Sequence, residues 1–148
     1  SQYVSALLMI GPTLEKGLEL KLLGNVISRP YIDLTLNVMH EYGADAEWTD
    51  IDTITIRPKR YEERSYTIEN DWTAASYWYA ILTLLNDRKS YIRFPGLKNG
   101  SRQGDSAAKY IFSLLGVKTT FADKEMDELT DVTITRKPQM LPRLERES

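Results

Sequence analysis

Cysteine is absent from the sequence, and its 148 residues include a single histidine, His40. The absence of cysteine excludes disulfides, thiolate metal ligands and thiol nucleophiles together. One histidine cannot provide the set of imidazole ligands that many zinc centres share. We therefore expect no metal site and no catalysis of the Ser-His-Asp or Cys-His type.

The sequence also lacks long apolar runs and an excess of charge of one sign. No run approaches the ~18 apolar residues of a membrane-spanning helix, and we expect no signal peptide. The 19 Lys and Arg residues are balanced by 21 Asp and Glu residues, so the net charge is −2. This balance gives no general surface for nucleic acid. We expect a cytoplasmic protein with neither a nucleic-acid partner nor a membrane partner.

Recognisable catalytic and phosphate-binding motifs are equally scarce. No glycine-rich phosphate loop and no pair of carboxylates at a catalytic spacing stands out. A composition of 42% apolar and 27% charged residues predicts a packed core. The sequence therefore supplies binding groups, and no catalytic acid or base is identified in it.

Residues 28–42, SRPYIDLTLNVMHEY, carry the signals of a complete helix. Ser28 is a capping hydroxyl, Pro30 is preset for the first turn, and Gly43 suits the left-handed residue that ends a helix. The Ser28 hydroxyl and the Tyr31 phenol then stand at the positive end of the helix dipole, where an anion can bind. Simple capping is the alternative interpretation of the same residues.

Periodicity predicts two successive runs with the order helix, strand, helix, strand, strand. In the first run the helices are residues 1–10 and 30–42, and the strands are 18–22, 44–48 and 53–57. In the second run the helices are 72–85 and 106–115, capped by Asp71 and Asp105, and the strands are 90–94, 117–121 and 131–136. A further strand, residues 65–69, joins the two runs.

The two runs form an internal repeat of an αβαββ unit. Three pairs of identical residues align at a spacing of about 70 residues: Ser5 with Ser76, Asp33 with Asp105, and Gly43 with Gly116. The repeat predicts an α/β (α+β) architecture of two lobes joined by a hinge strand at residues 65–69.

Three segments resemble the EPSP synthase family, the 3-phosphoshikimate 1-carboxyvinyltransferases. They are SQYVSALL at residues 1–8, ISRPYIDLTL at residues 27–36, and Asp71 with the Ala-Ser-Tyr of residues 75–77. The second segment is the most specific of the three. The resemblance covers essentially the whole chain and keeps the segments in the family's order, with near-family spacing.

The resemblance implies a two-domain enzyme built from repeated βαβαββ-type units, three in each domain. Residues 1–67 would be the last unit of the first domain, and residues 68–148 the first unit of the second. The implied reaction moves the enolpyruvyl group of phosphoenolpyruvate to the 5-hydroxyl of shikimate 3-phosphate and releases phosphate. No metal or organic cofactor is implied, and the remainder of the same polypeptide would be the partner of this segment.

The resemblance also implies which residues contact the substrates. Ser1, Gln2, Ser28 and Tyr31 would bind shikimate 3-phosphate, and Gln2 would also lie near phosphoenolpyruvate. Arg29 stands where the family often has a basic residue. The family's catalytic acid, its Lys-Glu pair and its later arginines have no counterpart in this sequence, so the fragment alone is expected to be inactive.

Residues 70–77, NDWTAASY, depart from the family pattern Gly-Asp-x-Ser-Ser-Ala-Ser-Tyr. Asn70 tolerates the left-handed conformation better than most residues, so the turn can persist, whereas Trp72 changes the packing expected at the hinge. Two alternatives remain open. One is the related enolpyruvyl transferase that acts on UDP-N-acetylglucosamine, against which the SRPYID segment argues. The other is a non-catalytic ligand-binding module of the same fold.

Overall fold

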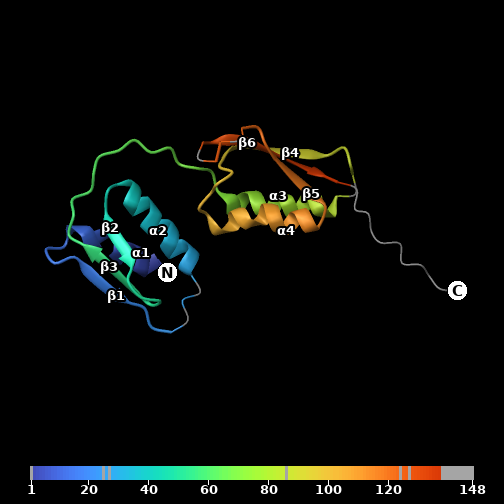
Figure 1. The fold of residues 1–148 in the computed structure, drawn as a ribbon. Coiled ribbons are helices and arrows are strands. Elements are labelled where there is room, and N and C mark those ends of the chain that lie inside the picture. The colour runs from blue at the N-terminus through green and yellow to red at the C-terminus, as the bar shows by residue number, and fades with distance from the viewer. Residues whose placement is uncertain are drawn as a thin grey trace. The chain divides into compact units, whose positions relative to one another are not determined.

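The computed structural model describes residues 2–24, 26, 28–85, 87–123, 125–126 and 128–137. The chain divides into two compact units, Ser1–Thr67 and Ile68–Ser148, named unit 1 and unit 2 below. Each unit contains its own helices and its own antiparallel sheet (Figure 1). The fold class is therefore α+β, as the repeat predicts.

Unit 1 contains two helices, a short 3-10 helix and a three-stranded sheet. The elements in order are α1 (Gln2–Ile10), η1 (Gly11–Thr13), β1 (Leu18–Lys21), α2 (Arg29–Glu41), β2 (Asp45–Trp48) and β3 (Thr53–Arg57). The strand order is β1-β3-β2, and both neighbouring pairs are antiparallel. The central strand β3 alternates, so that Ile54 and Ile56 are buried while Thr53 and Thr55 are half-buried.

The core of unit 1 lies between its two helices and its sheet. Its buried members come from α1, α2 and the adjoining residues of β2 and β3: Leu8, Ile32, Leu36, Met39, Ala44, Ala46, Ile54 and Ile56. Burying a large apolar side chain of this kind contributes ~1.5–3 kcal/mol. The buried residues of α2, which are Ile32, Leu36 and Met39, recur at helical spacing and form its inner face.

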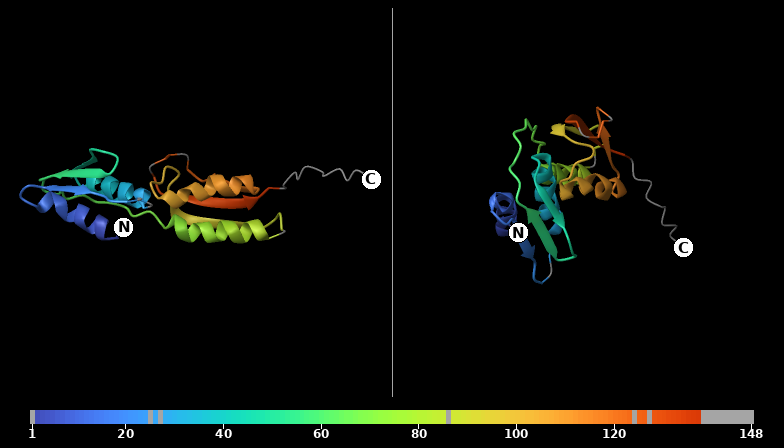
Figure 2. Two further views of the ribbon diagram at one scale, coloured as in Figure 1. Left: turned by 90° about the horizontal axis from the view of Figure 1, so that it is seen from below. Right: turned by 60° about the vertical axis from the view of Figure 1, so that its left-hand side comes forward.

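Unit 2 repeats this order with different residues. Its elements are α3 (Trp72–Leu84), β4 (Tyr91–Leu97), the 3-10 helix η2 (Gly104–Ala107), α4 (Ala108–Leu114), β5 (Val117–Phe121) and β6 (Thr130–Arg136). The strand order β4-β6-β5 is the counterpart of β1-β3-β2. Both helices lie on one face of the sheet, as Figures 1 and 2 show.

The core of unit 2 is built around two aromatic residues of α3. Trp72 and Tyr79 are both 0% exposed, and the Tyr79 ring lies 6.2 Å from that of Phe94 and 5.5 Å from that of Phe112. Aromatic pairs at this separation are worth about 0.5–1.5 kcal/mol beyond the burial of their area. Trp72 is thus a core residue of unit 2.

Several helices begin or end at the residues that the sequence predicts. Gly43 and Gly116 have φ values of +82° and +85°, the left-handed conformation that ends a helix at little steric cost in glycine. Asp71 caps α3 by accepting a hydrogen bond from the Thr73 N–H at 2.8 Å. The sequence predicts these three positions correctly.

The strand predicted at residues 65–69 is wrong, and with it the hinge strand. The structure describes residues 58–71 without helix or strand, and Ile68 is 81% exposed. Alternation predicts a strand only where one side of it is buried, and here that side has no core to face. A single backbone hydrogen bond, from Asn70 N–H to the Gly96 carbonyl at 2.8 Å, joins this segment to β4. Asn70 does not adopt the left-handed conformation, since the only positive φ values described belong to glycine.

Strand β4 continues to Leu97, past residue 94 where the sequence predicted its end, and so includes Pro95 and Gly96. Its register against β6 shifts between Phe94 and Leu97, which marks an irregularity of the bulge type. Gly96 adopts a φ of +65°, and β4 is an edge strand, where a proline can lack its ladder hydrogen bond. Turn residues inside a strand therefore mark a bulge here, not its end.

The helix start assigned to Asp105 also differs from the expectation. A turn of 3-10 helix, η2, precedes α4, and Gln103 occupies the capping position of η2 without a side-chain capping bond. The Asp105 carboxylate accepts a hydrogen bond from the Thr73 hydroxyl at 2.5 Å, so it ties η2 to α3. Asp105 thus bonds a residue distant in the sequence and does not cap its own helix.

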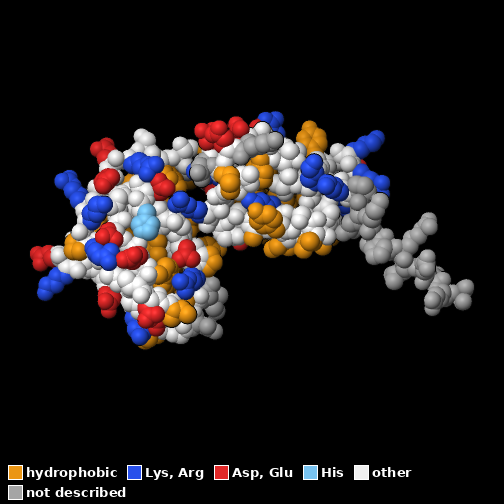
Figure 3. All heavy atoms as spheres, viewed as in Figure 1, with side chains coloured by type: hydrophobic (Ala, Val, Ile, Leu, Met, Phe, Trp, Pro, Cys, Tyr) orange, Lys and Arg blue, Asp and Glu red, His pale blue; other side chains and the backbone are white. Residues whose placement is uncertain are grey.

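Charged side chains of both signs are interspersed on the face of unit 1 seen in Figure 3. That face presents no wide basic patch of the kind that binds nucleic acid. Within the described ranges, no helix has the length and apolar character needed to cross a membrane.

Candidate functional site

The two helices of unit 1 run side by side in the same direction. The Ser5 hydroxyl of α1 lies 3.0 Å from the Thr35 hydroxyl of α2, and one turn further along Met9 and Val38 line the same groove. Both helices therefore begin at the same end of unit 1, which Figure 1 also shows. Because each helix start carries a partial positive charge, two starts at one end add their fields.

A short hydroxyl chain fixes the two helices against one another. The Thr35 hydroxyl donates to the Tyr31 carbonyl at 2.9 Å, which uses its only proton. The Ser5 hydroxyl is then the donor in its bond to Thr35. These two hydrogen bonds fix the start of α2, at Tyr31, beside the start of α1. Both starts lie about one helical turn from the Ser5–Thr35 bond.

Ser28 occupies the capping position of α2 without acting as a cap. Its side chain makes no capping hydrogen bond, whereas its carbonyl accepts the N–H groups of Tyr31 at 3.1 Å and Ile32 at 3.3 Å. Pro30 has no N–H to offer. The Ser28 hydroxyl is therefore free to donate to a ligand at the positive end of the helix.

Gln2 lies at the start of α1 and Tyr31 lies in the first turn of α2, and both side chains are exposed. Gln2 is the first residue of α1, and the Tyr31 side chain is 59% exposed. Ser1, the fourth residue expected at the site, lies outside the described residues. The structure thus brings three of the four expected residues to helix starts at one end of unit 1.

Arg29 is partly committed to the structure of unit 1. Its guanidinium donates to the Ile51 carbonyl at 3.1 Å and lies 4.1 Å from the centre of the Trp48 ring. The Trp48 indole in turn donates to the Asp33 carboxylate at 2.8 Å. Arg29 therefore keeps a positive charge beside the start of α2 while its side chain is held on an aromatic face.

The described first turns of both helices carry no negative side chain. The first turns of α1 and α2 contain neither Asp nor Glu. His40 lies at the opposite end of α2, where its ring nitrogen bonds the Ala46 carbonyl. The arrangement suits an anion at the helix starts and offers no acid or base to act on it.

The start of α3 in unit 2 is filled by the protein itself. The Gln103 side chain accepts from the Trp72 N–H at 2.9 Å and donates to the Glu69 carboxylate at 3.1 Å. Glu69 also accepts from the Trp72 indole, the Lys98 N–H and the Ser101 hydroxyl, each at 2.7 Å. This cluster, named the Glu69 network, was not found from the sequence, because its members lie up to 34 residues apart.

A second surface of unit 1 is apolar and has no groups that would bind an anion. A groove of about 460 Å³ along α1 and α2 is lined mainly by apolar side chains, and beside it the Tyr61 hydroxyl donates to the Met9 carbonyl at 2.8 Å. Burial raises the pKa of Tyr61 above its ordinary value, so the phenol stays protonated. Among the described residues, no group of His, Asp and Glu side chains is arranged to hold a metal ion.

Comparisons with known proteins identify the same family that the sequence resembles. The family model of EPSP synthase (3-phosphoshikimate 1-carboxyvinyltransferase) matches residues 1–145. A 3-phosphoshikimate 1-carboxyvinyltransferase of Bacteroides fragilis is 48% identical over 123 residues, which cover 83% of this chain and 30% of that protein. The enzymes of that name from Histophilus somni and Methanosphaera stadtmanae are 32% and 29% identical, and the matches cover 83% and 96% of this chain. The chain spans about a third of the length of these curated relatives.

Proposed function

The chain belongs to the EPSP synthase family, and from this premise we propose that it is the central part of a 3-phosphoshikimate 1-carboxyvinyltransferase. The complete enzyme transfers the enolpyruvyl group of phosphoenolpyruvate to shikimate 3-phosphate in the biosynthesis of chorismate and the aromatic amino acids. It works in the cytoplasm. Residues 1–67 are the last unit of its first domain, and residues 68–148 are the first unit of its second domain.

The role of this segment is to bind shikimate 3-phosphate at the helix starts of unit 1. The Ser28 hydroxyl donates to the substrate phosphate, and Ser1, Gln2 and Tyr31 line the same pocket. Gln2 also approaches phosphoenolpyruvate. The observation that supports this most is the parallel pair α1 and α2, whose starts lie together with the Ser28 hydroxyl unused. Hydroxyl donors and helix dipoles can neutralise a phosphate without a cluster of lysines.

The segment binds but does not catalyse. The charged groups described at the helix starts of unit 1 include no carboxylate or imidazole that is free to move a proton. The catalytic acid and the groups that hold phosphoenolpyruvate come from the remainder of the polypeptide. The 148-residue chain alone should therefore show no turnover with both substrates present.

Substitution of Ser28 in the complete enzyme tests the proposal. Ser28→Ala removes one charge-assisted hydrogen bond, worth ~1.5–3 kcal/mol, and should raise the KM for shikimate 3-phosphate by about 10- to 150-fold. The KM for phosphoenolpyruvate should change much less. Ser65→Ala is the matched control, because Ser65 is an exposed serine in the same unit. Unchanged kinetics in Ser28→Ala would remove this residue from the site.

An assay with two acceptor substrates distinguishes the proposed activity from that of the enolpyruvyl transferase that acts on UDP-N-acetylglucosamine. The complete enzyme should consume shikimate 3-phosphate and leave UDP-N-acetylglucosamine unchanged when each is supplied with phosphoenolpyruvate. Turnover of the sugar nucleotide alone would reassign the enzyme within the family. Tight binding of shikimate 3-phosphate with no turnover would instead support a non-catalytic module.

A further inference from the structure

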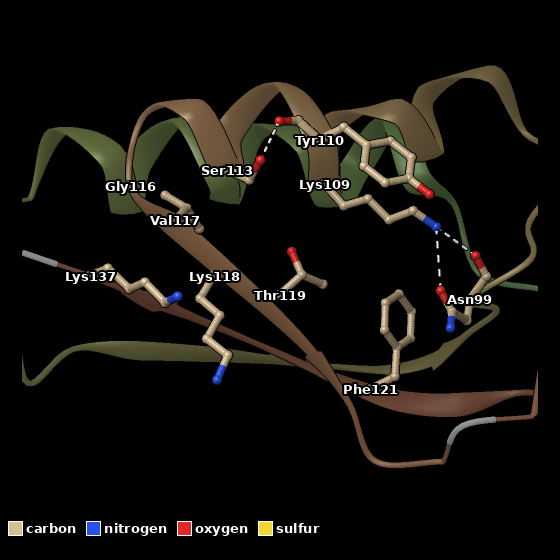
Figure 4. A pocket seen from close by; sticks show the side chains of 10 residues that line it. All are labelled: Asn99, Lys109, Tyr110, Ser113, Gly116, Val117, Lys118, Thr119, Phe121 and Lys137. Carbon is tan, nitrogen blue, oxygen red and sulfur yellow. Dashed lines mark hydrogen bonds between the residues drawn. The ribbon is translucent and has the colours of Figure 1, made fainter. Parts of the chain in front are cut away.

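The lysines around the cavity of unit 2 do not converge on one ligand. This cavity, of about 310 Å³, lies between α4 and the edge strand β5 (Figure 4). The Lys109 ammonium donates to the Asn99 carbonyl at 2.6 Å. Lys118 points away from α4, because it lies on the opposite face of β5 from the buried Val117. Arg29 of unit 1, in contrast, stands at a helix start, where its charge adds to a positive field.

Arg29 carries a charge that the described part of the protein does not neutralise. It is the first residue of α2 and follows Ser28, whose side chain makes no capping bond. Its guanidinium offers several N–H donors, and one of them is used by the Ile51 carbonyl at 3.1 Å. None of the ion pairs among the described residues includes Arg29. The residue next to Ser28 therefore has donors to spare for an anion.

Asp33 is the carboxylate whose position on α2 would allow it to neutralise Arg29. The two residues are four apart in the helix, a spacing at which opposite charges can form an ion pair. The Asp33 carboxylate instead accepts a hydrogen bond from the Trp48 indole at 2.8 Å. Trp48 thus engages the carboxylate that would otherwise compete for the guanidinium.

The same tryptophan also holds the guanidinium in place. The Cζ atom of Arg29 lies 4.1 Å from the centre of the Trp48 ring. A contact of this kind attracts the cation without cancelling its charge, and it leaves the N–H groups at the edge of the guanidinium accessible. A carboxylate in the place of the ring would hold Arg29 as well, but it would neutralise the charge that an anion needs.

Trp48 can hold its neighbours because it is itself fixed. It is the last residue of β2, pairs with Ile54 across the β2–β3 ladder and packs half-buried against the core of unit 1. Rotation of its ring would break the hydrogen bond to Asp33. The Ile51 carbonyl, which accepts from Arg29, belongs to the turn that follows β2. The sheet therefore fixes the side chain of the residue that begins α2.

We propose that Trp48 is a positioning residue for the phosphate of shikimate 3-phosphate. It holds the Arg29 guanidinium at the start of α2 and keeps the Asp33 carboxylate from pairing with it. The guanidinium and the Ser28 hydroxyl then bind the phosphate together, through charge-assisted hydrogen bonds. This inference rests on the proposed function, because it concerns the same phosphate site. Trp48 acts through Arg29 and does not contact the substrate.

Kinetics of a Trp48 variant of the complete enzyme test this role. Trp48→Leu removes the ring and releases Asp33, so the KM for shikimate 3-phosphate should rise about three- to tenfold. The kcat should stay within about twofold, because the lost interaction is made in the ground state and the transition state alike. Tyr91→Leu is the matched control, since it removes an exposed aromatic side chain from an edge strand of unit 2. It should leave both constants unchanged.

A second substitution separates positioning from a simple loss of packing. If Asp33 pairs with Arg29 once the indole is gone, adding Asp33→Asn to Trp48→Leu should lower the raised KM by about twofold. Asp33→Asn alone should have a smaller effect, because the new amide oxygen can still accept from the indole. A purely structural role of Trp48 predicts the same effect of Asp33→Asn in both backgrounds.

Nuclear magnetic resonance of the isotopically labelled 148-residue chain tests the contact without turnover. At about 150 mM salt, where exposed charges are largely screened, inorganic phosphate should shift the side-chain N–H signal of Arg29. Phosphate should bind Trp48→Leu at least about threefold more weakly, as judged from the same signal. Unchanged amide signals of Ile54 and Ile56, in the core of unit 1, show that the variant is folded.

The two measurements distinguish failure of this inference from failure of the proposed function. If the complete enzyme does not use shikimate 3-phosphate, yet phosphate shifts the Arg29 signal and binds Trp48→Leu more weakly, the proposed function fails and the role of Trp48 stands. A KM in Trp48→Leu equal to that of the wild type would overturn the inference. So would an equal effect of Asp33→Asn in both backgrounds, or no shift of the Arg29 signal by phosphate in the wild-type chain.

Discussion

Units 1 and 2 share an element order and a strand order, yet their helix starts differ. The start of α2 leaves the Ser28 hydroxyl without a capping bond, whereas the start of α3 is filled by Asp71 and by the Glu69 network. In the repeat α3 corresponds to α1 and not to α2, so the comparison is between units: unit 1 presents an open positive helix end, whereas the start of α3 in unit 2 is closed. A repeat of the fold does not imply a repeat of the site.

The second helices of the two units show the same contrast. Helix α2 runs without interruption over Arg29–Glu41, while its counterpart in unit 2 begins as the 3-10 helix η2 before α4. The Asp105 carboxylate, which aligns with Asp33, is taken by the Thr73 hydroxyl. The polar groups at these two helix starts of unit 2 therefore join its own elements.

The largest expected effect tests whether each unit has a core of its own. Trp72→Ala should destabilise unit 2 by about 3–5 kcal/mol, because it removes a fully buried indole and leaves a cavity. Hydrogen exchange of the chain should then show lost protection at β4, β5 and β6. Protection at β3 should remain, since its Ile54 and Ile56 pack in a separate cluster. Equal loss of protection in both units would contradict the division.

The next effect tests the closed helix start. Glu69→Ala leaves four donors without their acceptor and should lower the free energy of unfolding by about 2–3 kcal/mol in a urea titration. Glu63→Ala, at an exposed position of the preceding segment, should change it by less than about 0.5 kcal/mol. If the two variants were alike, the Glu69 network would contribute nothing to stability.

The smallest effect concerns pH. Burial raises the pKa of Tyr79 above its ordinary value of 10.0, while its bond to Thr119 acts in the opposite direction. A phenol with a raised pKa stabilises the fold fully below pH 10 and loses that contribution as the pH rises through the folded-state pKa. Tyr79→Phe should cost about 1 kcal/mol near pH 9 and clearly less near pH 11, in thermal melts at each pH. A cost that is the same at both pH values would show that Tyr79 does not titrate differently in the fold.

Local signals in the sequence predicted most of the fold. Gly43, Gly116 and Asp71 act within one turn of the chain, so their roles could be assigned without a structure. The bounds of β3 and β5 also follow from alternation alone. The segment 65–69 failed because alternation cannot reveal whether a core exists for the strand to cover.

The site could be predicted only in part, because its features depend on distant partners. The resemblance indicated Gln2, Ser28 and Tyr31, and the structure adds the parallel direction of α1 and α2 that the Ser5–Thr35 bond holds. Asp105 was predicted as a cap, yet its partner Thr73 is 32 residues away. The pairing of Gln103 with Glu69 has no signal in either local sequence.

The contrast between an open and a closed helix start can be tested most directly by a crystal structure of the complete enzyme with shikimate 3-phosphate bound. We expect a phosphate oxygen within hydrogen-bond distance of the Ser28 hydroxyl, at about 2.5–3.0 Å, beside the starts of α1 and α2. A phosphate bound elsewhere, with the Ser28 hydroxyl facing only water, would contradict it.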